Sequence, residues 1–280
     1  MRLVRTKAEV REWVRDVRGA GERVALVPTM GALHAGHLSL VELAKRHAGR
    51  TALSIFVNPL QFGPTEDLDR YPRDLERDAA LAREAGVDLV FAPSTREMYP
   101  DGEPATVVVP ERGVDGLDGA SRPGHFRGVL TVVAKLFGIF APDVAVFGEK
   151  DYQQLTLIRR MVLDLDYPIA VVGGPIVREP DGLAMSSRNR YLTDEERVRA
   201  RSLSRALARC RSLFASGERA AGPFREALRE AAGPGVEVEY AEVVDPDTLA
   251  PLERIGDRAV CAVAARVGAT RLIDNTILES

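Results

Sequence analysis

The sequence contains no long hydrophobic run. Its apolar stretches are broken by charge or glycine, as in residues 129–140, which Lys135 interrupts. None reaches the roughly 20 residues that a membrane-spanning helix needs. Residues 1–5 (MRLVR) become charged again at once and contain no apolar signal core. We therefore predict no membrane association and no secretion, and we expect the protein in the cytoplasm.

The sequence also has few cysteines and a small net charge. Cys210 and Cys261 lie in different segments; a disulfide between them is possible, but buried free thiols in a reducing compartment are favoured. The 38 basic and 41 acidic residues leave a net charge of -3, which gives no support for nucleic-acid binding. A hydrophobic content of 45% over 280 residues is typical of a globular protein with one or two domains.

Strand and helix patterns alternate through the first 175 residues. Short apolar runs predict strands at 23–28, 52–57, 87–91, 144–147 and 169–172, with helical patterns between them. This alternation predicts an α/β fold with a parallel, Rossmann-like sheet covered by helices on both faces. Ligands in such folds bind outside the carboxyl ends of the strands.

The pattern changes after about residue 175. Two helices are predicted at 194–216 and 223–232, and three strand-like runs follow at 236–244, 259–267 and 270–277. Helices followed by strands predict a smaller C-terminal α+β domain. We therefore divide the chain into domains 1–178 and 179–280.

The segment 28–37 (PTMGALHAGH) links the first predicted strand to a helix. Gly31 and Gly36 permit a close approach of the backbone to a ligand, and the N–H groups at a helix start favour phosphate. His34 and His37 share one face of a helical turn. Their imidazoles can donate hydrogen bonds to charge that develops during nucleotidyl transfer. A zinc site is a weaker alternative, because the His-Glu-x-x-His pattern is absent and the chain has only four histidines. Ordinary helix-start residues are a second, weaker alternative.

Other polar residues lie near the second predicted strand. Gln61 follows the turn at 58–59 (NP), and its amide suits a substrate with hydroxyls and a carboxylate; a plain surface loop is the alternative. Asp78 either faces a magnesium ion that ATP brings or lies on a solvated helix face. The segment 122–126 (RPGHF) either meets an anionic ligand or leads into a helix, so its role stays open.

Two later loops carry cations after predicted strands. Lys150 stands where a strand passes into a helix, and a point charge there suits phosphate, although a solvated lysine is the alternative. Residues 186–188 (SSR) offer two hydroxyls and a guanidinium that can hold a triphosphate. The alternative for this second loop is a polar interdomain linker.

Residues 34–37 match the His-x-Gly-His signature of the nucleotidyltransferase superfamily, which includes class I aminoacyl-tRNA synthetases. The wider string 28–40 (PTMGALHAGHLSL) resembles the pantothenate synthetase family in particular, and the resemblance runs through most of the chain. Segments 58–63 (NPLQFG), 147–154 (FGEKDYQQ) and 184–189 (AMSSRN) also carry it. The last looks like the Lys-Met-Ser-Lys-Ser loop of synthetases, but it lacks the lysines, and Arg188 would replace the second.

The resemblance implies a role for each matching position. Gln61 and Gln154 would bind pantoate, and β-alanine would later occupy the region of Gln61. The implied catalytic residues are His34, His37, Lys150 and Arg188, with His37 as the better proton donor. The implied ATP-binding residues are Met30, Gly31, Ala32, Leu33, His34, Ala35, Gly36, His37, Gly148, Glu149, Lys150, Asp151, Val177, Met185, Ser186, Ser187 and Arg188.

The implied reaction condenses pantoate with β-alanine through pantoyl adenylate and releases pyrophosphate and AMP. ATP would enter as a substrate with Mg²⁺, without a tightly bound organic cofactor or a protein-held metal, and the family implies a homodimer. Two rivals remain: another nucleotidyltransferase of the same fold and a non-catalytic nucleotide-binding module. Gln61 and Gln154 argue against the first, since a phosphorylated substrate would call for more cations. His37 and Lys150, standing in their motifs, argue against the second.

Overall fold

The computed structural model describes residues 1–64 and 66–280, which form two compact units. Unit 1 comprises Met1–Glu111, Arg122–Glu149 and Leu157–Pro175. Unit 2 comprises Arg112–Ser121, Lys150–Thr156 and Ile176–Ser280. The division into domains 1–178 and 179–280 stays a prediction.

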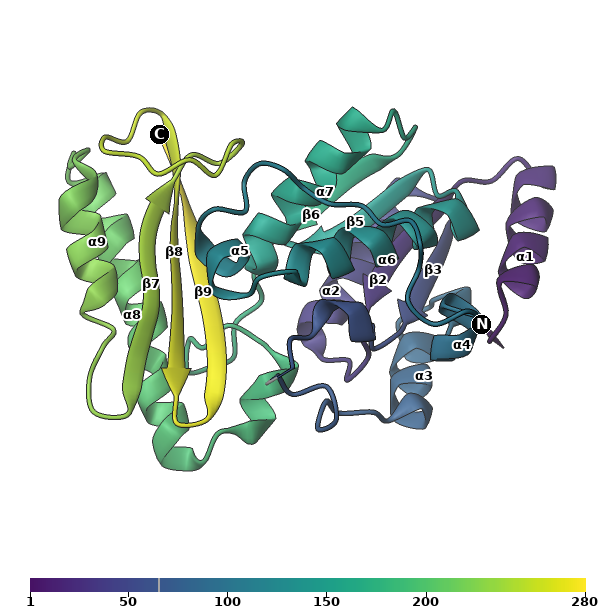
Figure 1. Ribbon diagram of the computed structural model, residues 1–280, viewed down its shortest axis with the longest axis horizontal. Helices are drawn as coiled ribbons and strands as arrows, with labels where there is room; N and C mark the ends of the chain where they lie inside the picture. Colours follow the sequence, from purple (N-terminus) through teal and green to yellow (C-terminus); the bar gives the residue numbers. More distant parts are fainter. Residues whose placement is uncertain (65) are drawn as a thin grey trace. The chain divides into compact units, whose positions relative to one another are not determined.

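Unit 1 is built on a six-stranded parallel sheet with strand order β1-β4-β3-β2-β5-β6 (Figure 1). The predicted α/β class and parallel sheet are confirmed. Buried aliphatic side chains dominate the central strands because helices cover the sheet. β1 was not predicted, since its three residues carry too little pattern. The strands are β1 (Arg2–Val4), β2 (Val24–Thr29), β3 (Arg50–Ile55), β4 (Leu89–Phe91), β5 (Val144–Gly148) and β6 (Ala170–Gly174).

Helices in unit 1 connect these strands. The first helix, α1, was not predicted, although Thr6 and Glu9 form a capping box at its start. The apolar helix α6 carries the largest share of buried residues. The bounds are α1 (Lys7–Gly19), α2 (Ala35–His47), η1 (Pro59–Gln61), α3 (Leu75–Glu84), α4 (Thr95–Met98) and α6 (His125–Phe140); α7 (Tyr152–Asp164) begins in unit 2 and ends in unit 1.

Unit 2 contains an antiparallel sheet of order β7-β8-β9 packed with two helices, which confirms the α+β prediction for this part of the chain (Figure 1). Its core includes both cysteines, which are free and buried. The elements are α5 (Leu117–Ser121), η2 (Glu149–Asp151, shared with unit 1), η3 (Ser187–Tyr191), α8 (Asp194–Ala215), α9 (Ala221–Arg229), β7 (Val236–Val244), β8 (Arg258–Val267) and β9 (Thr270–Glu279).

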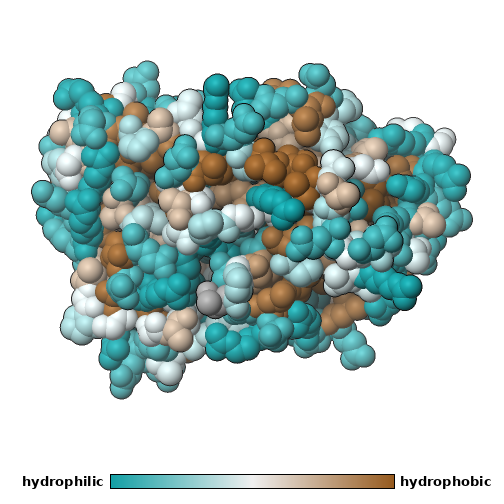
Figure 2. Space-filling model, viewed as in Figure 1, coloured by the Kyte–Doolittle hydropathy of each residue, from teal (hydrophilic) through white to brown (hydrophobic). Residues whose placement is uncertain are grey.

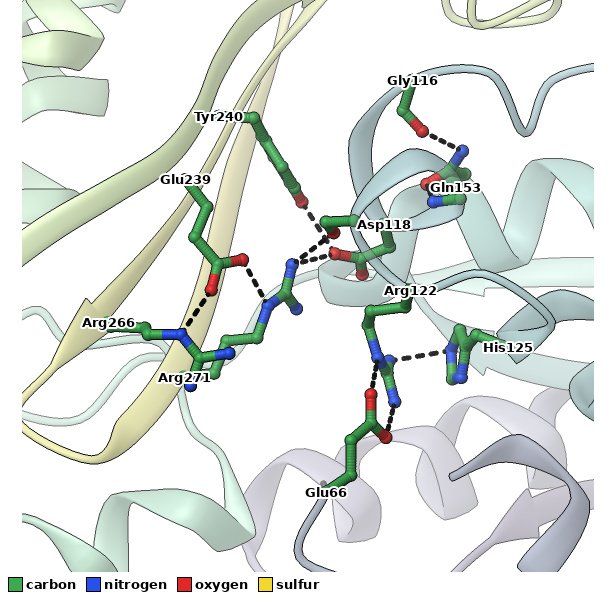
Figure 3. A network of polar contacts seen from close by, with 12 residues as sticks. Glu66, Gly116, Asp118, Arg122, His125, Gln153, Glu239, Tyr240, Arg266 and Arg271 are labelled. Atoms are coloured by element: carbon green, nitrogen blue, oxygen red, sulfur yellow. Dashed lines mark hydrogen bonds and ion pairs between the residues drawn. The ribbon is translucent and has the colours of Figure 1, made fainter. Parts of the chain in front are cut away.

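A polar network attaches α5 to the antiparallel sheet within unit 2 (Figure 3). Asp118 accepts hydrogen bonds from the Arg271 guanidinium at 2.6 Å and from the Tyr240 hydroxyl at 3.3 Å. Glu239 accepts from Arg271 and from Arg266, at 2.7 and 2.9 Å. Burial and the nearby Asp118 charge raise the pKa of Tyr240, so its hydroxyl stays protonated and donates.

The surface in view is mostly polar. Teal hydrophilic residues cover most of the face in Figure 2, and hydrophobic residues appear as separate brown areas between them. Within residues 1–64 and 66–280, no helix combines the length and the apolar character that crossing a membrane requires.

Candidate active site

The carboxyl ends of three adjacent parallel strands carry the candidate residues of unit 1. β2 pairs with β3 on one side and with β5 on the other, so the segments that follow them leave the same edge of the sheet. Residues 30–37 follow β2, Gln61 follows β3, and Gly148 ends β5. The fold therefore places these predicted residues at the edge where ligands of α/β proteins bind.

The rings of His34 and His37 lie against each other at the start of α2, with their planes tilted by 35°. Their ring centroids are 4.0 Å apart, and the His34 backbone N–H points at Nδ1 of His37 over a long 3.4 Å. Because Nδ1 of His37 accepts there, a neutral His37 ring carries its proton on Nε2. His37 can thus donate from Nε2 to a phosphate oxygen, as expected for the predicted proton donor.

Asp78 shapes the loop before these histidines. Its two carboxylate oxygens accept the backbone N–H groups of Ala32 and Leu33, both at 2.8 Å. The loop turns through positive φ at Gly31 and Ala32, and a Cβ on Gly31 would lie 2.9 Å from Asp78 Oδ2. The alternative of a solvated helix face is wrong, since Asp78 is only 1% exposed. The Asp78 carboxylate therefore binds backbone N–H groups instead of facing water.

Gln61 is held by side chains from two directions. The buried Asn58 donates from Nδ2 to Gln61 Oε1 at 3.1 Å, and the Tyr99 hydroxyl fixes Asn58 by donating to its Oδ1 at 2.8 Å. Burial raises the pKa of Tyr99, which keeps this donor protonated. Gln61 Nε2 in turn lies 3.1 Å from Met30 Sδ. The structure thus brings together the predicted pantoate residue and the start of the predicted ATP loop.

A second set of polar residues, Glu66, Arg122 and His125, leads to the backbone carbonyl of Gln61 (the three side chains are in Figure 3). Arg122 donates from Nε and Nη2 to the two carboxylate oxygens of Glu66, both at 2.7 Å. The His125 ring stands between Arg122 Nη1, at 2.9 Å from Nε2, and the Gln61 carbonyl, at 2.8 Å from Nδ1. Burial opposes the charge of Glu66, but the Arg122 hydrogen bond and charge outweigh it and lower the pKa of Glu66. Sequence reasoning left the Arg122 segment open and missed Glu66.

In unit 2, Ser186, Ser187 and Arg188 directly follow a tight hairpin of residues 177–185. Arg178 and Ala184 form an antiparallel bridge, and Met185 N–H donates to the Val177 carbonyl at 3.0 Å. The predicted ATP residues Val177 and Met185 are therefore neighbours. The Ser186 hydroxyl accepts the Arg188 backbone N–H at 3.2 Å, which starts η3.

The side chain of Glu179 connects this hairpin to the rest of unit 2 through hydrogen bonds. It accepts from Asn189 Nδ2 at 2.7 Å and from the Arg197 guanidinium. Asn189 also donates to the Ala184 carbonyl at 3.0 Å, and Arg197 donates to Asp181 at 2.9 Å. These partners were missed from the sequence, because no local pattern marks contacts between a loop and a helix further along the chain.

Lys150, Asp151 and Gln154 belong to the same unit. The Lys150 carbonyl accepts from Asn275 Nδ2 at 2.8 Å, which fixes η2 where the chain enters α7. The neighbouring Gln153 points elsewhere: its amide donates to the carbonyls of Gly113 and Gly116, at 2.7 and 3.0 Å. Gln153 is buried and binds backbone, whereas Gln154 is half-buried, which leaves Gln154 as the candidate for a ligand.

No group of three or more His, Cys, Asp or Glu residues suited to a metal ion occurs in the part of the chain that the structure describes. Each unit offers polar groups that can bind a ligand. Unit 1 offers imidazole donors, backbone N–H groups and a fixed amide at a strand edge. Unit 2 offers a lysine, two hydroxyls and an arginine on tightly held turns. Each set by itself consists of groups that bind phosphate or carboxylate oxygens.

Comparison with known proteins gives a consistent result along the whole chain. The profile of the pantoate-beta-alanine ligase family matches residues 2–277. Pantothenate synthetase from Moorella thermoacetica is 55% identical over 281 residues, which cover 100% of this chain and 99% of that protein. Pantothenate synthetase from Heliobacterium modesticaldum is 53% identical and is covered completely.

Solved structures agree with the sequence comparison. The crystal structure of pantothenate synthetase from Thermus thermophilus superposes with a TM-score of 0.93 at 52% identity, covering 99% of each chain. Pantoate-beta-alanine ligase from Francisella tularensis, complexed with beta-gamma ATP and beta-alanine, superposes with a TM-score of 0.82 at 32% identity. That match covers 99% of this chain and 97% of the other.

Proposed function

The chain belongs to the pantoate–β-alanine ligase family, and we propose from this membership that it works through pantoyl adenylate on the residues described above. It is an ATP-dependent ligase that joins pantoate to β-alanine to give pantothenate. The observation that carries the mechanism is the close His34–His37 pair at the edge of the parallel sheet, together with the Met30–Gln61 contact at the same edge.

The first half-reaction forms the adenylate. A pantoate carboxylate oxygen attacks the α-phosphorus of ATP, the bond from that phosphorus to the bridging oxygen breaks, and pyrophosphate leaves. His37 and His34 donate to the phosphate oxygens as charge develops there. Lys150, Ser186, Ser187 and Arg188 hold the β- and γ-phosphates, and Gln61 and Gln154 orient pantoate. Most of the rate comes from holding the carboxylate in line.

The second half-reaction forms the amide. The β-alanine nitrogen attacks the acyl carbon, the bond from that carbon to the AMP oxygen breaks, AMP leaves, and the nitrogen loses a proton to solvent. The nucleotide is lined by backbone groups of Met30, Gly31, Ala32, Leu33, Ala35, Gly36, Gly148, Glu149, Asp151, Val177 and Met185.

A mixed anhydride is sensitive to water, so we also propose that residues 179–280 act as a lid.

Three further properties are proposals that rest on the family. Mg²⁺ enters with ATP, because this ion is usually held by substrate phosphates and water. The protein is cytoplasmic. It is a homodimer, for which light scattering should give twice the chain mass of 30.5 kDa; a mass of one chain would contradict the dimer.

Oxygen transfer tests the adenylate directly. Pantoate labelled with ¹⁸O in its carboxylate is incubated with the protein, MgATP and β-alanine, and AMP is analysed by mass spectrometry. One labelled oxygen in AMP is expected, because the attacking oxygen stays on phosphorus. His37→Ala should abolish most of the AMP release, whereas the exposed His47→Ala should not. AMP without label would overturn the adenylate, and no AMP from folded protein would overturn the activity.

A further inference from the structure

Arg122 and His125, at the entry to α6, have no role in the mechanism above, yet they belong to a directed series of hydrogen bonds in unit 1. The series begins at Glu66, which binds Arg122 through two parallel contacts of 2.7 Å (Figure 3). The side chains of Arg122 and Glu66 are 13% and 23% exposed. Two-point contacts between a guanidinium and a carboxylate fix direction as well as distance. Glu66 therefore determines where Arg122 Nη1 points.

Arg122 in turn determines the proton position on His125. A guanidinium only donates, so His125 Nε2, 2.9 Å from Arg122 Nη1, must accept. A neutral ring that accepts at Nε2 carries its proton at Nδ1. That nitrogen lies 2.8 Å from the Gln61 carbonyl oxygen, which can only accept. The sequence of donors thus runs from Arg122 through His125 to the backbone of Gln61.

The turn that receives this hydrogen bond also packs directly against α6, the helix that His125 begins. A Cβ on Gly128 would lie 2.1 Å from the Leu60 carbonyl oxygen, so helix and turn touch backbone to backbone. Asn58 Nδ2 bridges the Gly128 carbonyl and Gln61 Oε1, each at 3.1 Å. With its backbone and amide oxygen both held, Gln61 has little freedom to redirect its Nε2.

We propose that His125, in the Nδ1–H form imposed by Arg122 and Glu66, is a positioning residue that holds Gln61 in the orientation needed for pantoate. It acts through the Gln61 carbonyl and does not touch the reacting atoms. The inference rests on the proposed pantoate-binding role of Gln61. It assigns to the Arg122–His125 segment the task of setting affinity for pantoate while leaving affinity for ATP unchanged.

Two substitutions of similar polarity separate this role from general damage. In His125→Asn, the amide nitrogen can replace Nδ1 and still donate to Gln61. In His125→Gln, the polar group reaches the position of Nε2 and leaves the Gln61 carbonyl with only the long 3.5 Å contact from Arg122 Nη2. His125→Leu removes both contacts. His47→Leu is the matched control, because His47 is exposed at the end of α2.

The readout is the KM for pantoate against the KM for ATP, with pantoate binding also measured by calorimetry. We expect His125→Leu and His125→Gln to raise the pantoate KM about three- to tenfold, the size that loss of one neutral hydrogen bond gives. The ATP KM should stay within about twofold, and His125→Asn should restore most of the pantoate affinity. Glu66→Gln, which keeps the shape but removes the charge holding Arg122, should give a smaller rise in the same direction.

Specific results would overturn the proposal. An unchanged pantoate KM in His125→Leu, equal rises in both KM values, or an Asn variant as impaired as the Gln variant would each do so. If His125→Leu does not fold, the Asn–Gln comparison decides alone. Failure of the proposed function looks different, since the unaltered protein would then release no AMP in response to pantoate.

Discussion

Replacing Asp78 by Asn tests whether this buried acid holds the loop before His34. The carboxylate accepts from two backbone N–H groups at 2.8 Å, and an amide can accept only one of them. The other N–H would face an NH₂ group. Losing one hydrogen bond to a charged group costs about 1.5–3 kcal/mol. We expect the free energy of unfolding of unit 1 to fall by about 2–3 kcal/mol, which a stability of about 5–15 kcal/mol tolerates.

The assay uses the single tryptophan of the chain. Trp13 lies buried in α1, so its fluorescence during urea titration reports the unfolding of unit 1. Glu84→Gln is the matched control, because Glu84 is an exposed acid on the same helix as Asp78 and should change stability by less than about 0.5 kcal/mol. The ATP KM of Asp78→Asn should also rise about three- to tenfold, since the loosened loop leads directly to His34.

Equal unfolding free energies for the Asp78→Asn and Glu84→Gln variants would refute this reasoning. The two backbone contacts would then contribute nothing measurable to stability. A large loss of stability with an unchanged ATP KM would refute only the second part, in which the loop geometry sets nucleotide affinity.

Three other predictions follow from described contacts. Arg122 lowers the pKa of Glu66 below its usual 4.5 despite burial, so the stability of unit 1 should fall as pH drops below about 4.5. Glu66→Gln should weaken that dependence in acid titrations followed by fluorescence. Glu179→Gln should raise the ATP KM about threefold or more and leave the β-alanine KM unchanged, because it loosens the segment 184–189; equal changes in both would contradict this. Cys210 and Cys261 are fully buried, so neither thiol should react with a disulfide reagent before unfolding.

The layered α/β arrangement was predictable because buried parallel strands leave continuous apolar runs between glycine- and proline-marked turns. Such an apolar run is present in β2, β3, β4, β5 and β6. It is absent from β1, since three residues beside charged neighbours form no recognisable period. The capping box of α1 was present in the sequence as Thr6 and Glu9, but a capping pattern predicts a helix start only when an apolar period is recognised after it.

The candidate site was predictable only for residues that stand in marked turns. Glycine, histidine, lysine or serine at the end of a predicted strand indicates where a ligand can bind. The residues that support these positions cannot be identified from the sequence, because they are far away in it: Glu66 contacts Arg122 at a separation of 56 residues, and Arg178 contacts Asp274 at a separation of 96. Asp78 illustrates the difficulty: on sequence alone, an acid in a charged helix indicates solvent, and only the tertiary structure reveals the two N–H groups that it binds.

Unit 2 is built from three segments that are separated in the sequence, and this has a consequence for how the chain folds during its synthesis. Residues 112–121 and 150–156 leave the ribosome long before the antiparallel sheet exists. Asp118 must wait for Arg271, 153 residues later. At about 5–20 residues per second this delay lasts roughly 8–30 s. Nascent chains stopped before β9 should therefore hold the 112–121 segment unprotected against protease, and a chaperone that shields it would act in this interval.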